Sequence, residues 1–144
     1  MSRSGALSRI DALLASVSTP TFQYVVQGEP LSINASPVCA FWLSSRAVSV
    51  TTLTQVSSLT EFTVRAYWRV QSSQDVRESI ELNVWDACVN IASALRGDSN
   101  LSGNVSDLEI GTATTGYTEI GGLIFRTLNI PLSVEILGEV TITP

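Results

Sequence analysis

The sequence contains neither histidine nor lysine, so all eight of its basic residues are arginine. These absences remove the most frequent general base and the amine that forms Schiff bases, which leaves carboxylates, tyrosines and thiols for acid–base or covalent chemistry. Serines are abundant, yet none lies in a Gly-x-Ser-x-Gly elbow that would expose a nucleophile. We therefore expect a protein that is not an enzyme and has no catalytic residues.

Metal ligands are equally scarce. Cys39 and Cys88 are the only cysteines, and without histidine they cannot complete the four ligands of a zinc site. We expect both as small core residues, and the sequence leaves open a bond between them. The stretch from Asp98 through Gly103 to Glu109 is partly similar to a calcium loop, but its ligand spacing and flanking elements differ. No glycine-rich loop has the context that holds phosphate, so we expect no metal and no cofactor.

Charge is sparse as well, because charged residues form 15% of the chain, and the net charge is −5. A negative balance opposes general binding to nucleic-acid phosphates, which requires a basic surface. It is compatible with a protein that lines a passage for DNA, where a mildly acidic wall keeps the polymer from adhering. Few charges leave the surface of a monomer poorly solvated, which favours a partner or an oligomer. No apolar run reaches membrane-spanning length and no signal peptide is evident, so we expect no membrane association.

The clearest positive signal is an alternating strand from Glu61 to Val70. Successive side chains of a strand point to opposite faces, so this alternation predicts one buried face. The apolar positions are Phe62, Val64, Ala66, Trp68 and Val70, and the polar positions are Glu61, Thr63, Arg65, Tyr67 and Arg69.

After this strand the apolar period changes to three and four, which predicts a long amphipathic helix. Its apolar positions are Val76, Ile80, Val84, Ala87, Cys88, Ile91 and Leu95. Ser72 or Ser73 can cap its start, and Arg96 and Gly97 suit its end.

The remaining elements complete an α+β pattern. Helical spacing from Ser4 to Val17 predicts a short N-terminal helix, and residues 111–122 are expected to form a loop. Strands are expected at Phe22–Gln27, Pro37–Leu43, Leu108–Ile110 and Ile124–Ile136. This order predicts a single domain over residues 1–144, a mostly antiparallel sheet with the N-terminal helix and the long helix packed on it.

Two positions of the last strand depart from its pattern. Pro131 has no N–H for a ladder bond, so an edge or a bulge is expected there. Arg126 interrupts the apolar face, as a paired or rim-exposed charge would.

Residues 44–58 differ in character, with valines among serines and threonines and almost no charge. Such a stretch forms either a loop or a β arm that pairs with another segment, and we predict a subunit contact at Val48 and Val50. The strand face that carries Arg65 and Arg69 suits either single-stranded nucleic acid or a neighbouring subunit, and the negative net charge favours the subunit. With Arg126, these are the candidate interface residues.

From Thr60 to Val140 the chain resembles the tail terminator proteins of long-tailed, siphovirus-like bacteriophages, particularly those of actinobacteria. The matching segments are Phe62–Arg65, Arg96–Asp98, Leu101–Val105, Gly116–Tyr117, Gly122-x-x-Phe125-Arg126 and Ile130–Val134. The family often has a Gly-Gly pair where this chain has Ser102 and Gly103, and residues 44–58 lie outside the match.

The resemblance implies a small subunit that forms a hexameric ring at the head-proximal end of the tail tube, in the neck of the virion, assembled in the host cytoplasm. Such a ring stops tube polymerisation and contacts the tail tube protein and the head–tail connector or stopper protein, and DNA passes transiently through its lumen. One alternative is another neck or tail subunit, such as a head-closure or tail-tube protein. A second is a β-rich surface binding module, which would be a monomer with its two cysteines bonded.

Overall fold

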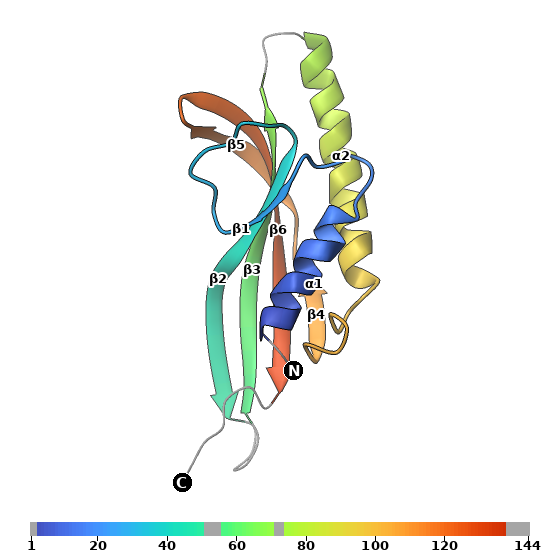
Figure 1. Ribbon diagram of the computed structural model, residues 1–144, viewed down its shortest axis with the longest axis vertical. Coiled ribbons are helices and arrows are strands. Elements are labelled where there is room, and N and C mark those ends of the chain that lie inside the picture. The colour runs from blue at the N-terminus through green and yellow to red at the C-terminus, as the bar shows by residue number, and fades with distance from the viewer. Residues whose placement is uncertain (1–2, 51–55, 71–73, 138–144) are drawn as a thin grey trace.

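Two helices pack on one face of a six-stranded, mostly antiparallel sheet (Figure 1). The computed structural model describes residues 3–50, 56–70 and 74–137. The elements are α1 (Arg3–Ala15), β1 (Val25–Gln27), β2 (Val38–Val50), β3 (Val56–Arg69), α2 (Gln74–Arg96), β4 (Asp107–Ile110), β5 (Thr114–Ile120) and β6 (Leu123–Leu137). This is the α+β fold that the sequence predicts.

The sheet is organised around β6, which has β3 on one side and both β5 and β4 on the other. β5 pairs with the first half of β6 and β4 with the second half, and both pairings are antiparallel. On the far side of β3 lies β2, and β1 pairs with β2 in parallel to form the opposite edge. The sheet therefore has a β1–β2 edge and a β4/β5 edge.

Pro131 lies within this central strand and not in an edge strand. Its carbonyl accepts a hydrogen bond from Gly111 N–H at 2.8 Å, on the side where β4 ends and β5 has not yet begun. Because the N–H and C=O of one residue in an antiparallel strand face the same neighbour, the missing donor falls at this gap. Pro131 therefore removes no hydrogen bond from the sheet at this position.

The main core lies between the sheet and the helices, and the two sequence periods predicted its members. Among the alternating positions Phe62, Val64, Ala66 and Trp68 are buried. The helix contributes its buried residues Ile80, Val84, Ala87, Ile91 and Leu95, and α1 contributes Ala6, Ile10, Leu13 and Leu14. The side chains of residues 71–76 lie outside the described residues, so the expected cap and Val76 are not placed.

A second, smaller cluster covers part of the opposite face of the sheet. Tyr67, expected on the polar face, is 1% exposed there and packs edge-on against Phe125, with ring centroids 6.3 Å apart. Ile33, from the connection between β1 and β2, joins this cluster with Val38 and Ala40. β2 is thus buried on both faces near its start, where Val38 and Ala40 face this cluster and Cys39 and Phe41 face the main core. We call the rest of this face, away from the helices, the open face.

Four strands depart by three residues or more from the sequence expectation, among them β3, which begins at Val56 instead of Glu61. Residues 111–122 form a strand rather than a loop over β5, which turns into β6 through Gly121 and Gly122 at φ values of 60° and 81°. Positive φ at both central positions is the requirement of a tight hairpin turn, which glycine meets without strain. The expected strand at residues 37–43 continues to Val50, and the strand at residues 22–27 is reduced to Val25–Gln27.

Candidate interface surfaces

Arg65 and Arg69, two of the predicted interface residues, lie on the open face near β2 and β6. The Arg65 Nε–H donates to Asn129 Oδ1, and its guanidinium lies 5.1 Å from the centroid of the Trp42 ring. Arg69 is exposed, and its backbone N–H donates to Ser36 Oγ at 3.0 Å. Arg65 is therefore held by cross-strand neighbours, whereas Arg69 presents its side chain to solvent.

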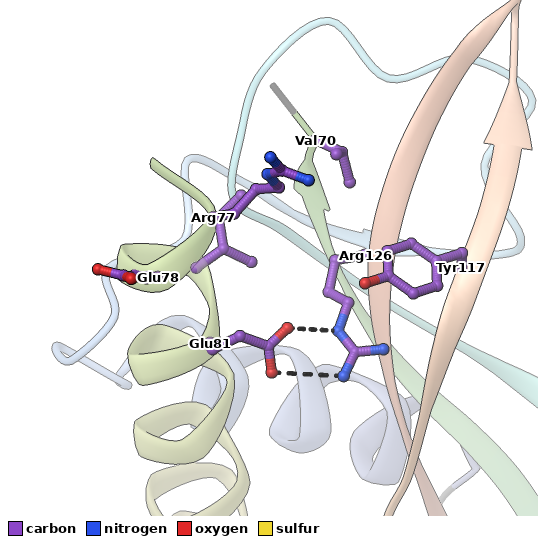
Figure 2. A pocket seen from close by; sticks show the side chains of 7 residues that line it. Val70, Arg77, Glu78, Glu81, Tyr117 and Arg126 are labelled. Carbon is purple, nitrogen blue, oxygen red and sulfur yellow. Dashed lines mark hydrogen bonds and ion pairs between the residues drawn. The ribbon is translucent and has the colours of Figure 1, made fainter. Parts of the chain in front are cut away.

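Arg126 lies on the other face of the sheet, beneath the first half of α2, and does not join these two arginines. Figure 2 shows its guanidinium against the Glu81 carboxylate, with Nε–Oε1 at 2.8 Å and Nη2–Oε2 at 3.4 Å. The same guanidinium lies 4.8 Å from the centroid of the Tyr117 ring and donates to the Gly116 carbonyl at 3.3 Å. Arg126 thus ties α2 to the β5–β6 hairpin, and its ion pair with Glu81 forms part of the wall of a small pocket that Arg77 and Glu78 also line.

Val48 and Val50 lie in the far part of β2, where the register pairs them with Ser58 and Val56 of β3. The side chains of residues 47–57 lie outside the described residues, so the predicted subunit contact stays a prediction. The backbone pairing shows that the described parts of residues 44–58 form the ends of two long strands. Figure 1 shows these ends extending beyond the start of α1.

The open face becomes acidic toward these strand ends. In the register Glu61 and Glu109 flank Ser133, and in the next row Asp107 is opposite Glu135. All four carboxylate side chains are exposed. This end of the sheet repels polyanions, which fits the overall negative charge.

Asp98, which the sequence places at the exit from α2, has a structural role. The Arg9 Nε–H donates to its Oδ2 at 2.6 Å, and the Ser102 backbone N–H donates to its Oδ1 at 3.0 Å. These two donors, Arg9 foremost, hold the pKa of the carboxyl below its ordinary value of 3.8. The carboxylate joins α1 to the turn after α2.

Acidification should remove the contribution of the Asp98 carboxylate to the stability of the fold. The pKa of Asp98 is lower in the folded chain than in the unfolded one, so its ionised form stabilises the fold above the unfolded value and ceases to do so as the pH falls through the folded value. We expect Asp98→Asn to lower the denaturation midpoint at pH 7, and the gap to wild type to narrow as the pH falls below about 4. Chemical denaturation from pH 7 to pH 3 measures this gap, with Glu119→Gln on exposed β5 as the control. A gap that stays constant with pH would contradict the role of the carboxylate.

The thiol of Cys39 is not poised for reaction at neutral pH. Cys39 and Cys88 are both free thiols, and Cys39 is fully buried. Burial, with a smaller contribution from Asp11, raises the pKa of the Cys39 thiol to about 12, so it is not a nucleophile at neutral pH. Within residues 3–50, 56–70 and 74–137 no group of three Cys, Asp or Glu side chains is placed to hold a metal ion. Neither helix of the described chain combines the length and apolarity that a membrane crossing requires.

One surface was not predicted from the sequence, a second apolar stripe on α2. Leu82, Trp85 and Val89 are 65%, 74% and 53% exposed, on the side of the helix that faces away from the core. Glu78 and Asp86 border them. We call these three residues the outer stripe. Their spacing of three and four residues is visible in the sequence, but the stronger core stripe of the same helix also accounts for helical periodicity.

A groove toward the β1–β2 edge of the sheet was also not predicted. It has a volume of about 310 Å³ and lies between the start of α1 and the far parts of β2, β3 and β6. Its apolar lining includes Leu7, Leu43, Phe62, Val134 and Ile136, and Arg3 and Arg46 contribute basic side chains to it. We call it the basic-rimmed groove. The sequence gives no local sign of it, because five separate elements, α1, β1, β2, β3 and β6, build its walls.

Among known proteins the chain has distant structural likenesses. No protein-family model and no curated protein matches the chain. Among solved structures, a chain of the "Virion of native gene transfer agent (GTA) particle" aligns over 90% of this chain and 91% of its own length, with a TM-score of 0.46 and 13% sequence identity. A likeness this distant carries no conclusion about fold or function, so the function rests on the surfaces described above.

Proposed function

We propose that this protein is a structural subunit of a phage virion, which forms a ring on the head-proximal end of the tail tube. The ring stops tube polymerisation and joins the tail to the head–tail connector. The observation that carries the proposal is the outer stripe, where three large apolar side chains of one helix are more than half exposed. A soluble monomer rarely leaves such a continuous apolar stripe uncovered, whereas a subunit of an assembly covers it with a neighbour.

Two other features support the same function. The resemblance to tail terminators covers the strands and the helix that build the sheet and its main core. The acidic end of the open face, with Glu61, Asp107, Glu109 and Glu135, would give a DNA passage a wall to which the polymer does not adhere. The absence of histidine and lysine from the sequence also agrees with a structural role.

The proposal predicts a defined ring and a defined tail length. The purified protein, alone or with isolated tail tubes, should give a closed particle of about six copies, in accord with the resemblance and with closed cyclic symmetry. Sedimentation and electron microscopy of tube ends measure this. Deletion of the gene should give tails of uncontrolled length. A strict monomer that never joins tube ends would refute the proposal, and a deletion that abolishes tails altogether would favour a tube protein instead.

A further inference from the structure

The outer stripe and the basic-rimmed groove lie toward opposite edges of the sheet. The stripe adjoins a shallow cavity between α2 and the β4/β5 edge, lined by Trp85, Val89, Ala113 and Thr115. The groove reaches the other edge, because Gln27 of β1 and Leu43 of β2 contribute to it. A contact between these two surfaces therefore cannot form within one subunit, but it can form between one subunit and the next.

The two surfaces are complementary in chemistry. The outer stripe is an apolar ridge bordered by the carboxylates of Glu78 and Asp86. The groove is an apolar hollow with the guanidinium-bearing side chains of Arg3 and Arg46 among its lining residues. An apolar ridge with acidic borders and an apolar hollow with basic borders attract one another, and opposite potentials also fix the register of docking.

We propose that the outer stripe of one subunit docks into the basic-rimmed groove of a second copy of this chain, with Trp85 as the anchor. This inference rests on the proposed ring and assigns its subunit contact. Because the two surfaces differ, the contact is heterologous, and each subunit uses its stripe on one neighbour and its groove on the other. Such a contact propagates head to tail and closes into a ring when the rotation per subunit fits. Large aromatic side chains that enter pockets dominate the binding energy of interfaces of this kind.

Two variants test the inference separately. Trp85→Asp removes the anchor from the stripe, and Leu43→Asp places a charge at the groove, where Leu43 is 56% exposed. Both positions are exposed in the subunit, so folding should persist, which circular dichroism and denaturation check. Leu31→Asp is the matched control, because Leu31 is 94% exposed and lies in neither surface. Each test variant should weaken self-association at least about thirtyfold, and the control should assemble like wild type.

The decisive measurement is a mixture of the two variants. Trp85→Asp retains an intact groove and Leu43→Asp retains an intact stripe, so an equal mixture contains one functional contact and should give a dimer that grows no further. Sedimentation velocity measures the dimer, and each variant alone should remain monomeric. If stripe packed against stripe, Leu43→Asp would assemble normally and the mixture would give no new species, which would overturn the inference.

Other outcomes are equally informative. If Leu43→Asp lowers the stability of the subunit without changing assembly, a segment of the same chain fills the groove and the inference fails. If wild type forms rings and both variants form them equally well, the proposed function stands and this contact is wrong. If wild type neither assembles nor joins tube ends, the proposed function itself fails.

Discussion

Replacing Trp68 with alanine is expected to lower the free energy of unfolding by about 3–5 kcal/mol, the largest single effect that we foresee in this chain. Trp68 is 2% exposed and lies in the main core beneath the helices. Its ring centroid is 6.4 Å from that of Phe22, which precedes β1. Alanine would leave a cavity at the junction of the sheet with the segment that follows α1, and the surrounding side chains could relax only partly.

Trp68→Phe should cost less than half as much. The indole Nε1 is buried and has no hydrogen-bond partner among the described residues, and such an orphaned donor costs about 1–3 kcal/mol. Phenylalanine removes the donor and keeps an aromatic ring against Phe22. Guanidinium titration of the two variants, at concentrations where the chain is monomeric, measures the difference. Equal losses for phenylalanine and alanine would contradict this account of the site.

Removal of the Arg126 side chain is expected to give the second large effect, a loss of about 2 kcal/mol for Arg126→Ala. An exposed ion pair alone contributes about 0–1 kcal/mol, and a cation over an aromatic ring adds about 0.5–1 kcal/mol. The Arg126 side chain is only 15% exposed, so its stem also loses packing. Lysine should restore little, because it cannot form the two-pronged contact with Glu81.

A double-mutant cycle separates these contributions. Glu81→Gln should cost less than Arg126→Ala, since the Glu81 side chain is 56% exposed and the arginine keeps Tyr117 and the Gly116 carbonyl as partners. The coupling between the two positions should be about 0.5–1 kcal/mol. A coupling of zero would mean that the ion pair contributes nothing and that Arg126 stabilises only through packing and its contacts with Tyr117 and the Gly116 carbonyl. Tyr117→Leu, which removes the aromatic face, completes the comparison.

Local periodicity was sufficient to predict the main core. The alternation at residues 61–70 identified the buried face of β3, and the spacing from Ile80 to Leu95 identified the core stripe of α2. Both patterns are properties of a single element, so the sequence of that element determines them. The pair Gly121 and Gly122 between two β-prone runs is a hairpin signal that the sequence contains. The expectation of a loop at residues 111–122 was therefore wrong, because β5 forms one strand of this hairpin.

What could not be predicted depends on the meeting of distant segments. Tyr67 is buried because the connection around Ile33 folds over one end of the open face, and nothing near Tyr67 in the sequence indicates that cover. The extension of β2 was hidden by the irregular register between Leu43 and Ser45, which breaks the alternation in that strand. The basic-rimmed groove requires α1, β1, β2, β3 and β6 together, so its existence follows only from the assembled fold.

The central position of β6 also determines when, during folding, the groove becomes available for assembly. β6 follows every other described strand in the chain, and it pairs with β3 across a long sequence separation, with Ile136 opposite Ser58. Contacts of such long range form late, both in refolding and during synthesis from the N-terminus. Val134 and Ile136 of β6 are part of the groove wall, so a nascent chain has no groove to offer until this strand has docked. A chain in which β6 has not yet docked therefore cannot accept a neighbour through the proposed contact, which separates folding in time from assembly.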